Sequence, residues 1–140
     1  MYGLDFRDGY TKNEPLDELV ITPTTKGDVD EPLTKAEIVS RGYLNCSQRN
    51  YIYEKALELF NMGTLLAKYR GLILVDTKYE FGFYNDEIIL MDEIHTCDSS
   101  RYWKADSFES RFAADQEPEK YDKDCIRAVS YTHLTLPTKA

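Results

Sequence analysis

The sequence predicts one domain that mixes helices with short strands and a β-hairpin. Three patterns support this class: a capping box followed by apolar residues at helical spacing, a short unbroken apolar run, and an Asn-Asp pair between two β-prone segments. The chain has 140 residues, of which 42% are hydrophobic and 13% aromatic. That length and composition are enough for one compact domain with its own core.

The first half of the chain is expected to hold a strand and two helices. A strand at Leu19–Ile21 is predicted from its apolar run, which Pro23 ends. Thr34 and Glu37 have the spacing of a capping box, so a short helix should follow Thr34. Ser47 is the expected cap of a longer helix. That helix is predicted from apolar residues three, four or seven positions apart: Ile52, Ala56, Leu59, Phe60 and Leu66.

The second half is expected to hold a buried strand and a hairpin. Leu72–Val75 is an unbroken apolar run, which is typical of a buried strand. Tyr79–Tyr84 and Glu87–Asp92 flank Asn85–Asp86, two residue types that tolerate the positive φ of a tight hairpin turn. Residues 113–124 are polar and acidic, so the sequence predicts a solvated loop there.

Charge and composition exclude several classes of protein. Seventeen basic and 25 acidic residues give a net charge of −8, which argues against nucleic-acid binding. No apolar run reaches the roughly 18 residues of a membrane span, and no signal-peptide order begins the chain, so a cytoplasmic protein without a membrane partner is expected. Cys46, Cys97 and Cys125 lack the spacing of a disulfide framework or zinc site and are expected to be reduced thiols.

A cluster of charged residues follows the predicted buried strand. Asp76, Lys78 and Glu80 alternate with other residues, so in extended backbone they project to one face. The hairpin should return the chain so that Asp92 approaches Glu80, and these two carboxylates could share one cation. Two carboxylates near a lysine suit Mg²⁺-nucleotide chemistry. Spacing alone leaves a second interpretation open, since exposed ion pairs are also common at strand ends.

Two consecutive motifs resemble one enzyme family. Leu72–Gly82, with the sequence LILVDTKYEFG, resembles the signature of the SAICAR synthetases (phosphoribosylaminoimidazole-succinocarboxamide synthases). Met91–Trp103 resembles the Asp-Glu pair of that family and its Thr/Ser-Pro-Asp-Ser-Ser-Arg-Phe/Tyr-Trp stretch, with Cys97 in place of the proline.

Two further segments, one on each side, extend this resemblance. Ile21–Lys26 and the following Asp30–Pro32 resemble the family's Thr-Pro-Thr/Ser-Thr-Lys loop and its His-Asp-Glu continuation, with Val29 in place of the histidine. Tyr121–Arg127 resembles its Phe-Asp-Lys-Gln-Phe/Tyr-Val-Arg segment. The four motifs stand in the family's order.

The resemblance implies an α+β fold of the SAICAR synthetase type, distantly similar to protein kinases. Residues 1–127 then correspond to the central region and C-terminal lobe of that domain. Residues 128–140 instead read as a non-native tail from adapter or vector sequence. The family's N-terminal ATP-binding lobe should precede Met1, so the chain is expected to be a fragment and nearly inactive by itself.

The activity implied by the resemblance is an ATP-dependent, Mg²⁺-dependent ligation in purine biosynthesis. The family joins carboxyaminoimidazole ribonucleotide to L-aspartate to give SAICAR, ADP and phosphate, through an acyl phosphate. Carried over residue by residue, Glu80 and Asp92 are the Mg²⁺ ligands, and Asp76 and Lys78 are catalytic. The residues implied to bind substrate are Lys26, Asp98, Ser99, Ser100, Arg101, Lys123 and Arg127.

Two alternative functions are less favoured than the ligase. Asp76 and Lys78 echo the Asp-x-Lys of a kinase catalytic loop, which favours a phosphotransferase, but Phe81 stands where kinases place an Asn. A non-catalytic nucleotide-binding fragment is the second alternative.

His95 has no motif partner, and a histidine in such a setting is more often structural than a proton shuttle. The sequence leaves a homo-oligomer open.

Overall fold

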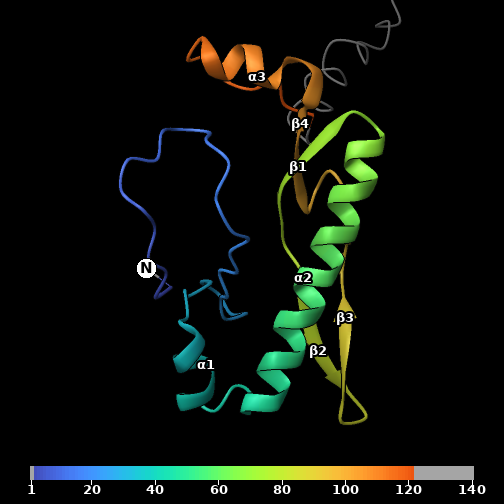
Figure 1. The fold of residues 1–140 in the computed structure, drawn as a ribbon. Helices are drawn as coiled ribbons and strands as arrows, with labels where there is room; N and C mark the ends of the chain where they lie inside the picture. The colour runs from blue at the N-terminus through green and yellow to red at the C-terminus, as the bar shows by residue number, and fades with distance from the viewer. Residues whose placement is uncertain (1, 122–140) are drawn as a thin grey trace, which may run out of the picture. The chain divides into compact units, whose positions relative to one another are not determined.

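The computed structural model describes residues 2–121 and divides the chain into two compact units, residues 1–59 and a second unit that begins at Phe60. The elements are a mixture of helices and short strands in the following order (Figure 1): α1 (Lys35–Ser40), α2 (Cys46–Tyr69), β1 (Leu72–Thr77), β2 (Glu80–Tyr84), β3 (Glu87–Met91), β4 (Ser100–Lys104) and α3 (Ala105–Ala113). Among the described helices, none has the length and apolar character needed to cross a membrane.

Helix α1 begins where the capping box predicts. The Thr34 hydroxyl accepts a hydrogen bond from the Glu37 backbone N–H at 3.1 Å, and Glu37 accepts one from the Thr34 N–H at 2.8 Å. Two donors at the helix start are thereby satisfied. The hydrogen bond from the Thr34 backbone is the main reason why the pKa of Glu37 is lowered.

Helix α2 is capped by Asn45, so the prediction of Ser47 as its cap is wrong. The Asn45 side chain accepts from the Gln48 N–H at 2.9 Å, and the Gln48 side chain accepts from the Asn45 N–H at 2.9 Å. This reciprocal pair has the geometry of a capping box, with Asn in place of Ser or Thr. Ser47 lies inside the helix as a result.

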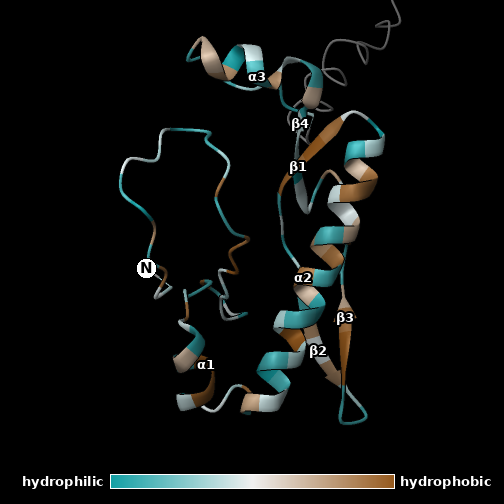
Figure 2. Ribbon diagram, viewed as in Figure 1, coloured by the Kyte–Doolittle hydropathy of each residue, from teal (hydrophilic) through white to brown (hydrophobic). Residues whose placement is uncertain are grey.

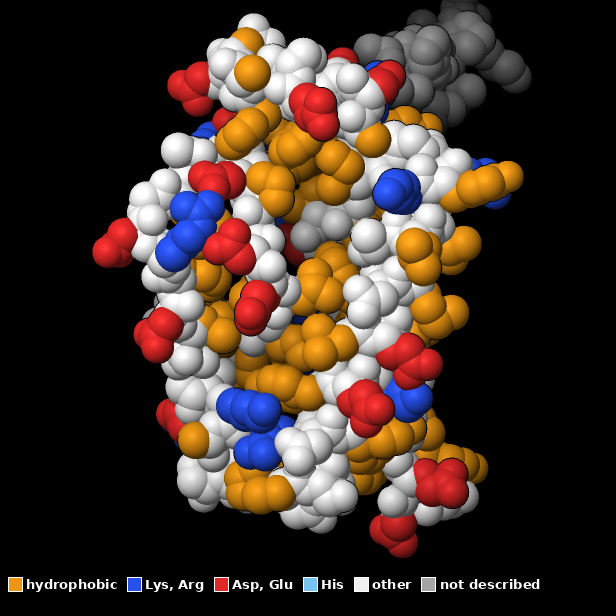
Figure 3. All heavy atoms as spheres, in the orientation of Figure 1, with side chains coloured by type: hydrophobic (Ala, Val, Ile, Leu, Met, Phe, Trp, Pro, Cys, Tyr) orange, Lys and Arg blue, Asp and Glu red, His pale blue; other side chains and the backbone are white. Residues whose placement is uncertain are grey.

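The predicted buried face of α2 is correct for part of its length. Ile52, Ala56, Leu59 and Phe60 are half-buried, but Leu66 is 66% exposed. Two small residues, Gly63 and Ala67, are buried on the C-terminal part of the helix instead. Figure 2 shows mixed hydropathy along α2, and Figure 3 shows that hydrophobic side chains remain at the surface. The large exposed side chains on this part of α2 are Met62, Leu65, Leu66 and Tyr69.

The strand predicted at Leu19–Ile21 is absent from the structure. Leu19 and Val20 are 49% and 38% exposed. These two side chains are therefore not packed against a neighbouring strand, and a strand without such packing is not stable by itself. Pairing occurs further along, as an isolated antiparallel bridge between Thr24 and Pro32. The run therefore reflects local composition rather than a strand.

The predicted hairpin forms as β2 and β3. Their register runs from Glu80 opposite Met91 to Tyr84 opposite Glu87. Asn85 and Asp86 have φ values of 49° and 64°, the left-handed conformation that a two-residue hairpin turn of this type requires. The turn chemistry and the apolar alternation thus fix this sheet locally.

The predicted strand after α2 is β1, and its partner is the distant strand β4. Leu72 lies opposite Lys104 and Thr77 opposite Ser100, with a register shift between Leu74 and Asp76. Leu74 is only 5% exposed and anchors this sheet. The sequence predicted neither β4 nor the helix that follows it, because β4 is formed through pairing with a strand far away in the chain.

Helix α3 begins directly after β4. Trp103 stacks on Phe108 with ring centroids 5.6 Å apart, and Phe108 stacks on Phe112 at 5.8 Å. Phe108 and Phe112 are four residues apart and so share one helix face. Trp103 therefore anchors the chain by packing, the more frequent role of an aromatic residue at such a position.

Candidate active site

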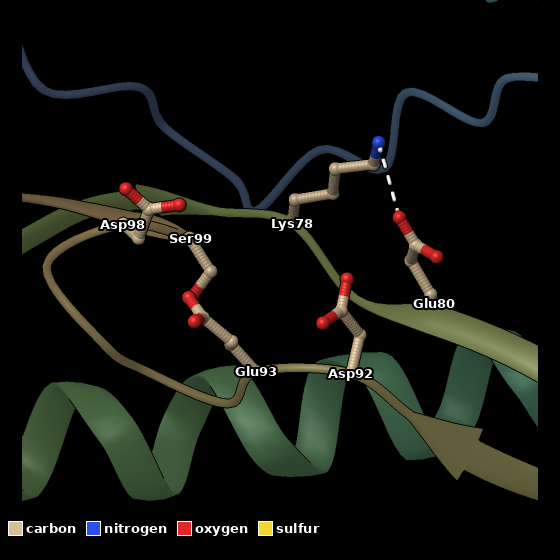
Figure 4. Close-up of a pocket in the computed structure, with 6 residues that line it drawn as sticks. All are labelled: Lys78, Glu80, Asp92, Glu93, Asp98 and Ser99. Carbon is tan, nitrogen blue, oxygen red and sulfur yellow. Dashed lines mark ion pairs between the residues drawn. The ribbon is translucent and has the colours of Figure 1, made fainter.

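A cavity of about 310 Å³ lies in the second unit, and charged side chains surround it (Figure 4). Two of its lining residues follow β1, and the others come from the connection between β3 and β4, residues 92–99, here called the acidic segment. The lining residues are Lys78, Glu80, Asp92, Glu93, Asp98 and Ser99. The chain thus gathers four carboxylates, one ammonium and one hydroxyl at a single opening.

Lys78 and Glu80 form one wall of the cavity. The Lys78 Nζ lies 3.2 Å from the Glu80 Oε1. The Glu80 side chain is only 15% exposed and that of Lys78 is 55% exposed, so the ammonium neutralises a carboxylate that is partly removed from water. Both side chains face the cavity, as the predicted alternation requires.

Asp92 enters the cavity because of the hairpin register. Met91 lies opposite Glu80, so Asp92 is the first residue beyond the paired strands. Its φ is 68°, which turns the chain out of β3. In Figure 4 its carboxylate points toward the space beside Lys78 and Glu80. The approach of Asp92 to this wall agrees with the geometry that the sequence predicted.

The rest of the acidic segment is held by its own hydrogen bonds. The Thr96 hydroxyl donates to Glu93 at 2.7 Å, and the Ser99 backbone N–H donates to the Thr96 hydroxyl at 3.2 Å. The Lys78 N–H donates to the Ser99 carbonyl at 2.9 Å and joins the segment to the opposite wall. Sequence reasoning missed Glu93 as a lining residue, although its place directly after Asp92 was a usable signal.

Asp76 has a different position from the one predicted. Its carboxylate accepts two hydrogen bonds from Arg101 on β4, one from Nε at 2.8 Å and a second from the guanidinium Nη2. Because the register shifts before Asp76 and β1 ends at Thr77, side-chain alternation does not continue unbroken to Lys78. Asp76 therefore does not share the wall formed by Lys78 and Glu80.

The remaining predicted residues are distributed more widely. Ser100 is 4% exposed, and its hydroxyl lies 2.8 Å from that of Thr77, so it makes a buried contact between β1 and β4. Lys26 is exposed in the loop between Thr24 and Pro32, in the first unit. Cys46 and Cys97 are free thiols, as predicted. Three other residues named from the sequence lie outside the described residues: Lys123, Cys125 and Arg127.

Tyr79 and His95 form a half-buried pair next to the lining residues. The Tyr79 Oη lies 2.5 Å from the His95 Nε2, and the two rings meet edge to face at a centroid distance of 5.5 Å. Burial, with a smaller contribution from Tyr102, raises the pKa of Tyr79 to about 12. Burial also lowers the pKa of His95. Both groups are therefore neutral at pH 7, and their hydrogen bond is one between uncharged partners.

The cavity has the donor types for a hard cation beside an anion. In the part of the chain that the structure describes, no three His, Cys, Asp or Glu residues form a metal cage. A cation such as Mg²⁺ is commonly held by one or two carboxylates together with phosphate oxygens and water. Carboxylates beside a lysine fit that mode better than a structural metal site.

Comparison with known proteins gives one consistent family. The family model for SAICAR synthetase matches residues 3–136. The putative phosphoribosylaminoimidazole-succinocarboxamide synthase 2 of Agrobacterium fabrum is 52% identical over 132 residues, covering 91% of this chain and 42% of that protein. The chloroplastic phosphoribosylaminoimidazole-succinocarboxamide synthase of Vigna aconitifolia is 51% identical over 128 residues, covering 90% of this chain and 38% of that protein. The chain thus spans about 40% of the length of these relatives.

Solved structures support the same assignment and the predicted fold class. A SAICAR synthase structure matches 94% of this chain and 41% of its own, with a TM-score of 0.70 and 29% identity. The SAICAR synthase of Saccharomyces cerevisiae in complex with SAICAR matches 96% of this chain and 44% of its own, with a TM-score of 0.65 and 27% identity. The fold is α+β, as predicted. On the combined evidence of motifs, sequence and fold, the chain belongs to the SAICAR synthetase family.

Proposed function

We propose that the chain supplies part of the active site of an ATP-dependent ligase that joins carboxyaminoimidazole ribonucleotide to L-aspartate in purine biosynthesis. Membership of the family supports this function. The observation that carries it is the cavity in which Lys78 and Glu80 face Asp92 and the rest of the acidic segment. These are the residue types that bring a Mg²⁺-nucleotide and an anionic substrate together.

The proposed reaction begins with activation of a carboxylate, which is a poor acyl donor. Transfer of the ATP γ-phosphoryl group to a carboxylate oxygen gives an acyl phosphate and ADP. The aspartate amine then attacks the carbonyl carbon, a C–N bond forms, phosphate leaves, and the amine loses a proton. The protein contributes mainly positioning and neutralisation of charge in such a sequence.

Individual residues take distinct parts in this proposal. Glu80 and Asp92 hold Mg²⁺, which supplies charge neutralisation for the phosphates. Lys78 lies against the phosphoryl group or the substrate carboxylate, and its contact with Glu80 keeps the ammonium at the cavity. Arg101 binds an anionic group of the ribonucleotide, and Asp76 fixes the orientation of its guanidinium.

Other parts of the function stay predictions. Asp98 and Ser99 are proposed substrate contacts at the cavity, and Lys26, Ser100, Lys123 and Arg127 are the remaining candidates. The matched relatives do not favour the phosphotransferase alternative. A relative is named as chloroplastic, so a cytoplasmic location stays a prediction.

The first experiment measures ADP release with and without L-aspartate. A hybrid protein is made in which the residues of this chain that align with the Agrobacterium fabrum relative replace their counterparts there. The hybrid and the 140-residue chain are each assayed with carboxyaminoimidazole ribonucleotide, ATP and Mg²⁺. The hybrid should turn over only when aspartate is present, and the chain alone should be nearly inactive. ADP release that ignores aspartate would favour the phosphotransferase.

A lysine substitution tests the role of the cavity in the same hybrid. Lys78→Ala should lower kcat/KM by about 100-fold or more, the usual loss for a group that stabilises developing charge. The control is Lys104→Ala, which removes an ammonium 3.8 Å from Glu119, away from the lining residues, and should change kcat/KM less than about twofold. Equal losses in both variants would contradict the assignment of Lys78.

A further inference from the structure

The acidic segment has hydrogen bonds of its own, and it also makes contacts with residues outside it. It contributes four of the six residues that line the cavity, yet it contains no helix or strand. Asp92 and His95 have φ values of 68° and 57°. This left-handed region is uncommon for residues with a Cβ, although Asp and His enter it more readily than most, and contacts with neighbouring groups stabilise the backbone there.

His95 makes such contacts with α2, with β4 and with the connection between β1 and β2. Its Nε2 lies 2.5 Å from the Tyr79 Oη, and its backbone carbonyl accepts a hydrogen bond from the Tyr102 hydroxyl at 2.7 Å. Its ring packs against Gly63 of α2, where an added Cβ would lie 2.6 Å from both Cε1 and Nε2. The ring thus occupies space that only a glycine leaves free.

The partner of His95 lies between the two residues of the opposite wall. Lys78 and Glu80 face the cavity, and Tyr79 stands between them with its side chain directed to His95. The two walls are joined at one end by the Lys78 N–H to Ser99 carbonyl bond and at the other by the hairpin register. The contact between Tyr79 and His95 is a third connection between the two walls. It lies between the other two, and neither residue lines the cavity.

We propose that His95 is a positioning residue that fixes the acidic segment at the distance from Lys78 and Glu80 that cation binding requires. The proposal rests on the proposed function, because it assigns the acidic segment to that same cation site. His95 acts through Asp92 and Glu93 and touches neither substrate nor cation. Its partners in this role are Tyr79, Tyr102 and Gly63.

The first test is amide hydrogen exchange of the 140-residue chain without added metal. Tyr79→Phe removes one hydroxyl and should speed exchange in the peptide that spans the acidic segment by about 3- to 10-fold. Tyr84→Phe is the matched control, since Tyr84 is 66% exposed near the hairpin turn, and it should leave that exchange unchanged. Unchanged exchange in folded Tyr79→Phe would overturn the proposal.

The second test measures the affinity of the chain for Mn²⁺ by electron paramagnetic resonance. Tyr79→Phe and Gly63→Ala should each weaken binding by about tenfold, the lower range for groups that orient metal ligands. Gly63→Ala should also shift the His95 ring resonances in NMR spectra, because its Cβ displaces the ring. If exchange becomes faster but the Mn²⁺ affinity is unchanged, His95 holds the acidic segment without affecting cation binding, and the proposed positioning role is wrong.

A carboxylate variant separates this proposal from the proposed function. Glu80→Gln removes a proposed ligand but keeps the contact of His95 with Tyr79. If Glu80→Gln leaves Mn²⁺ binding unchanged, the proposed cation site fails, while the exchange measurement still decides whether His95 anchors the segment. If Glu80→Gln weakens binding and Tyr79→Phe does not, the cation site stands and the positioning role of His95 is wrong.

Discussion

The two sheets of the second unit are built in different ways. In the β2–β3 sheet, neighbouring strands pair in unbroken register around a two-residue turn. In the β1–β4 sheet, Leu72 pairs with the distant Lys104, and the register shifts midway. The first sheet is specified by residues close together in the chain, and the second by packing around Leu74. The cavity lies where the chain passes from one sheet to the other, so it depends on both.

The largest expected difference between the sheets is the loss of stability when a buried leucine is replaced by alanine. Leu74→Ala should lower the free energy of unfolding by about 2–5 kcal/mol, because it leaves a cavity beside Gly63 of α2. Leu90→Ala in β3 should cost less, about 1–2 kcal/mol, since Leu90 is only half-buried. Urea unfolding followed by circular dichroism measures both. A larger loss for Leu90→Ala would reverse the comparison.

A smaller effect tests the local origin of the hairpin. Asp86 has a φ of 64°, so Asp86→Gly should raise the free energy of unfolding by about 0.5–1 kcal/mol by relieving the left-handed conformation. Glu87→Gly, one residue later in β3, should lower it by about the same amount, because glycine weakens a strand. The two substitutions are compared by thermal unfolding, and a loss of stability in Asp86→Gly would argue against turn strain.

The smallest effect concerns the protonation of His95, whose contact with Tyr79 joins the two walls of the cavity. Burial lowers the pKa of His95 in the folded state below its ordinary value of 6.5, so the unfolded chain binds more protons there. The stability from neutral His95 is complete above pH 6.5 and decreases as the pH falls through 6.5 toward the folded-state pKa. His95→Phe should flatten this dependence in urea unfolding at several pH values. An equally steep dependence in the variant would assign it to other groups.

Local signals in the sequence were sufficient for several elements. The capping box at Thr34 and the turn at Asn85–Asp86 were predicted because their partners lie within a few residues. Leu66 was assigned to the buried face of α2 because periodicity does not reveal that the small residues Gly63 and Ala67 face the packing partner. Strand β4 was missed because its pairing with β1 depends on residues far away in the chain.

The candidate site was predictable to a similar extent. Alternation placed Lys78 and Glu80 on one wall, and hairpin geometry brought Asp92 to it. Asp76 was placed on the same face because a register shift cannot be read from alternation alone. The partners of His95 could not be identified, since they depend on contacts from α2, Tyr79 and β4 that no local spacing encodes.

The residues that line the cavity all lie between Lys78 and Ser99 in one continuous stretch. Bringing its walls together therefore requires closure of a loop of only about 20 residues, which carries a small entropic cost. A hairpin forms within about 1–10 μs, whereas the pairing of β1 with β4 must wait until Lys104 has left the ribosome. During synthesis, the wall carried by the hairpin can be complete before the sheet that supports it has formed.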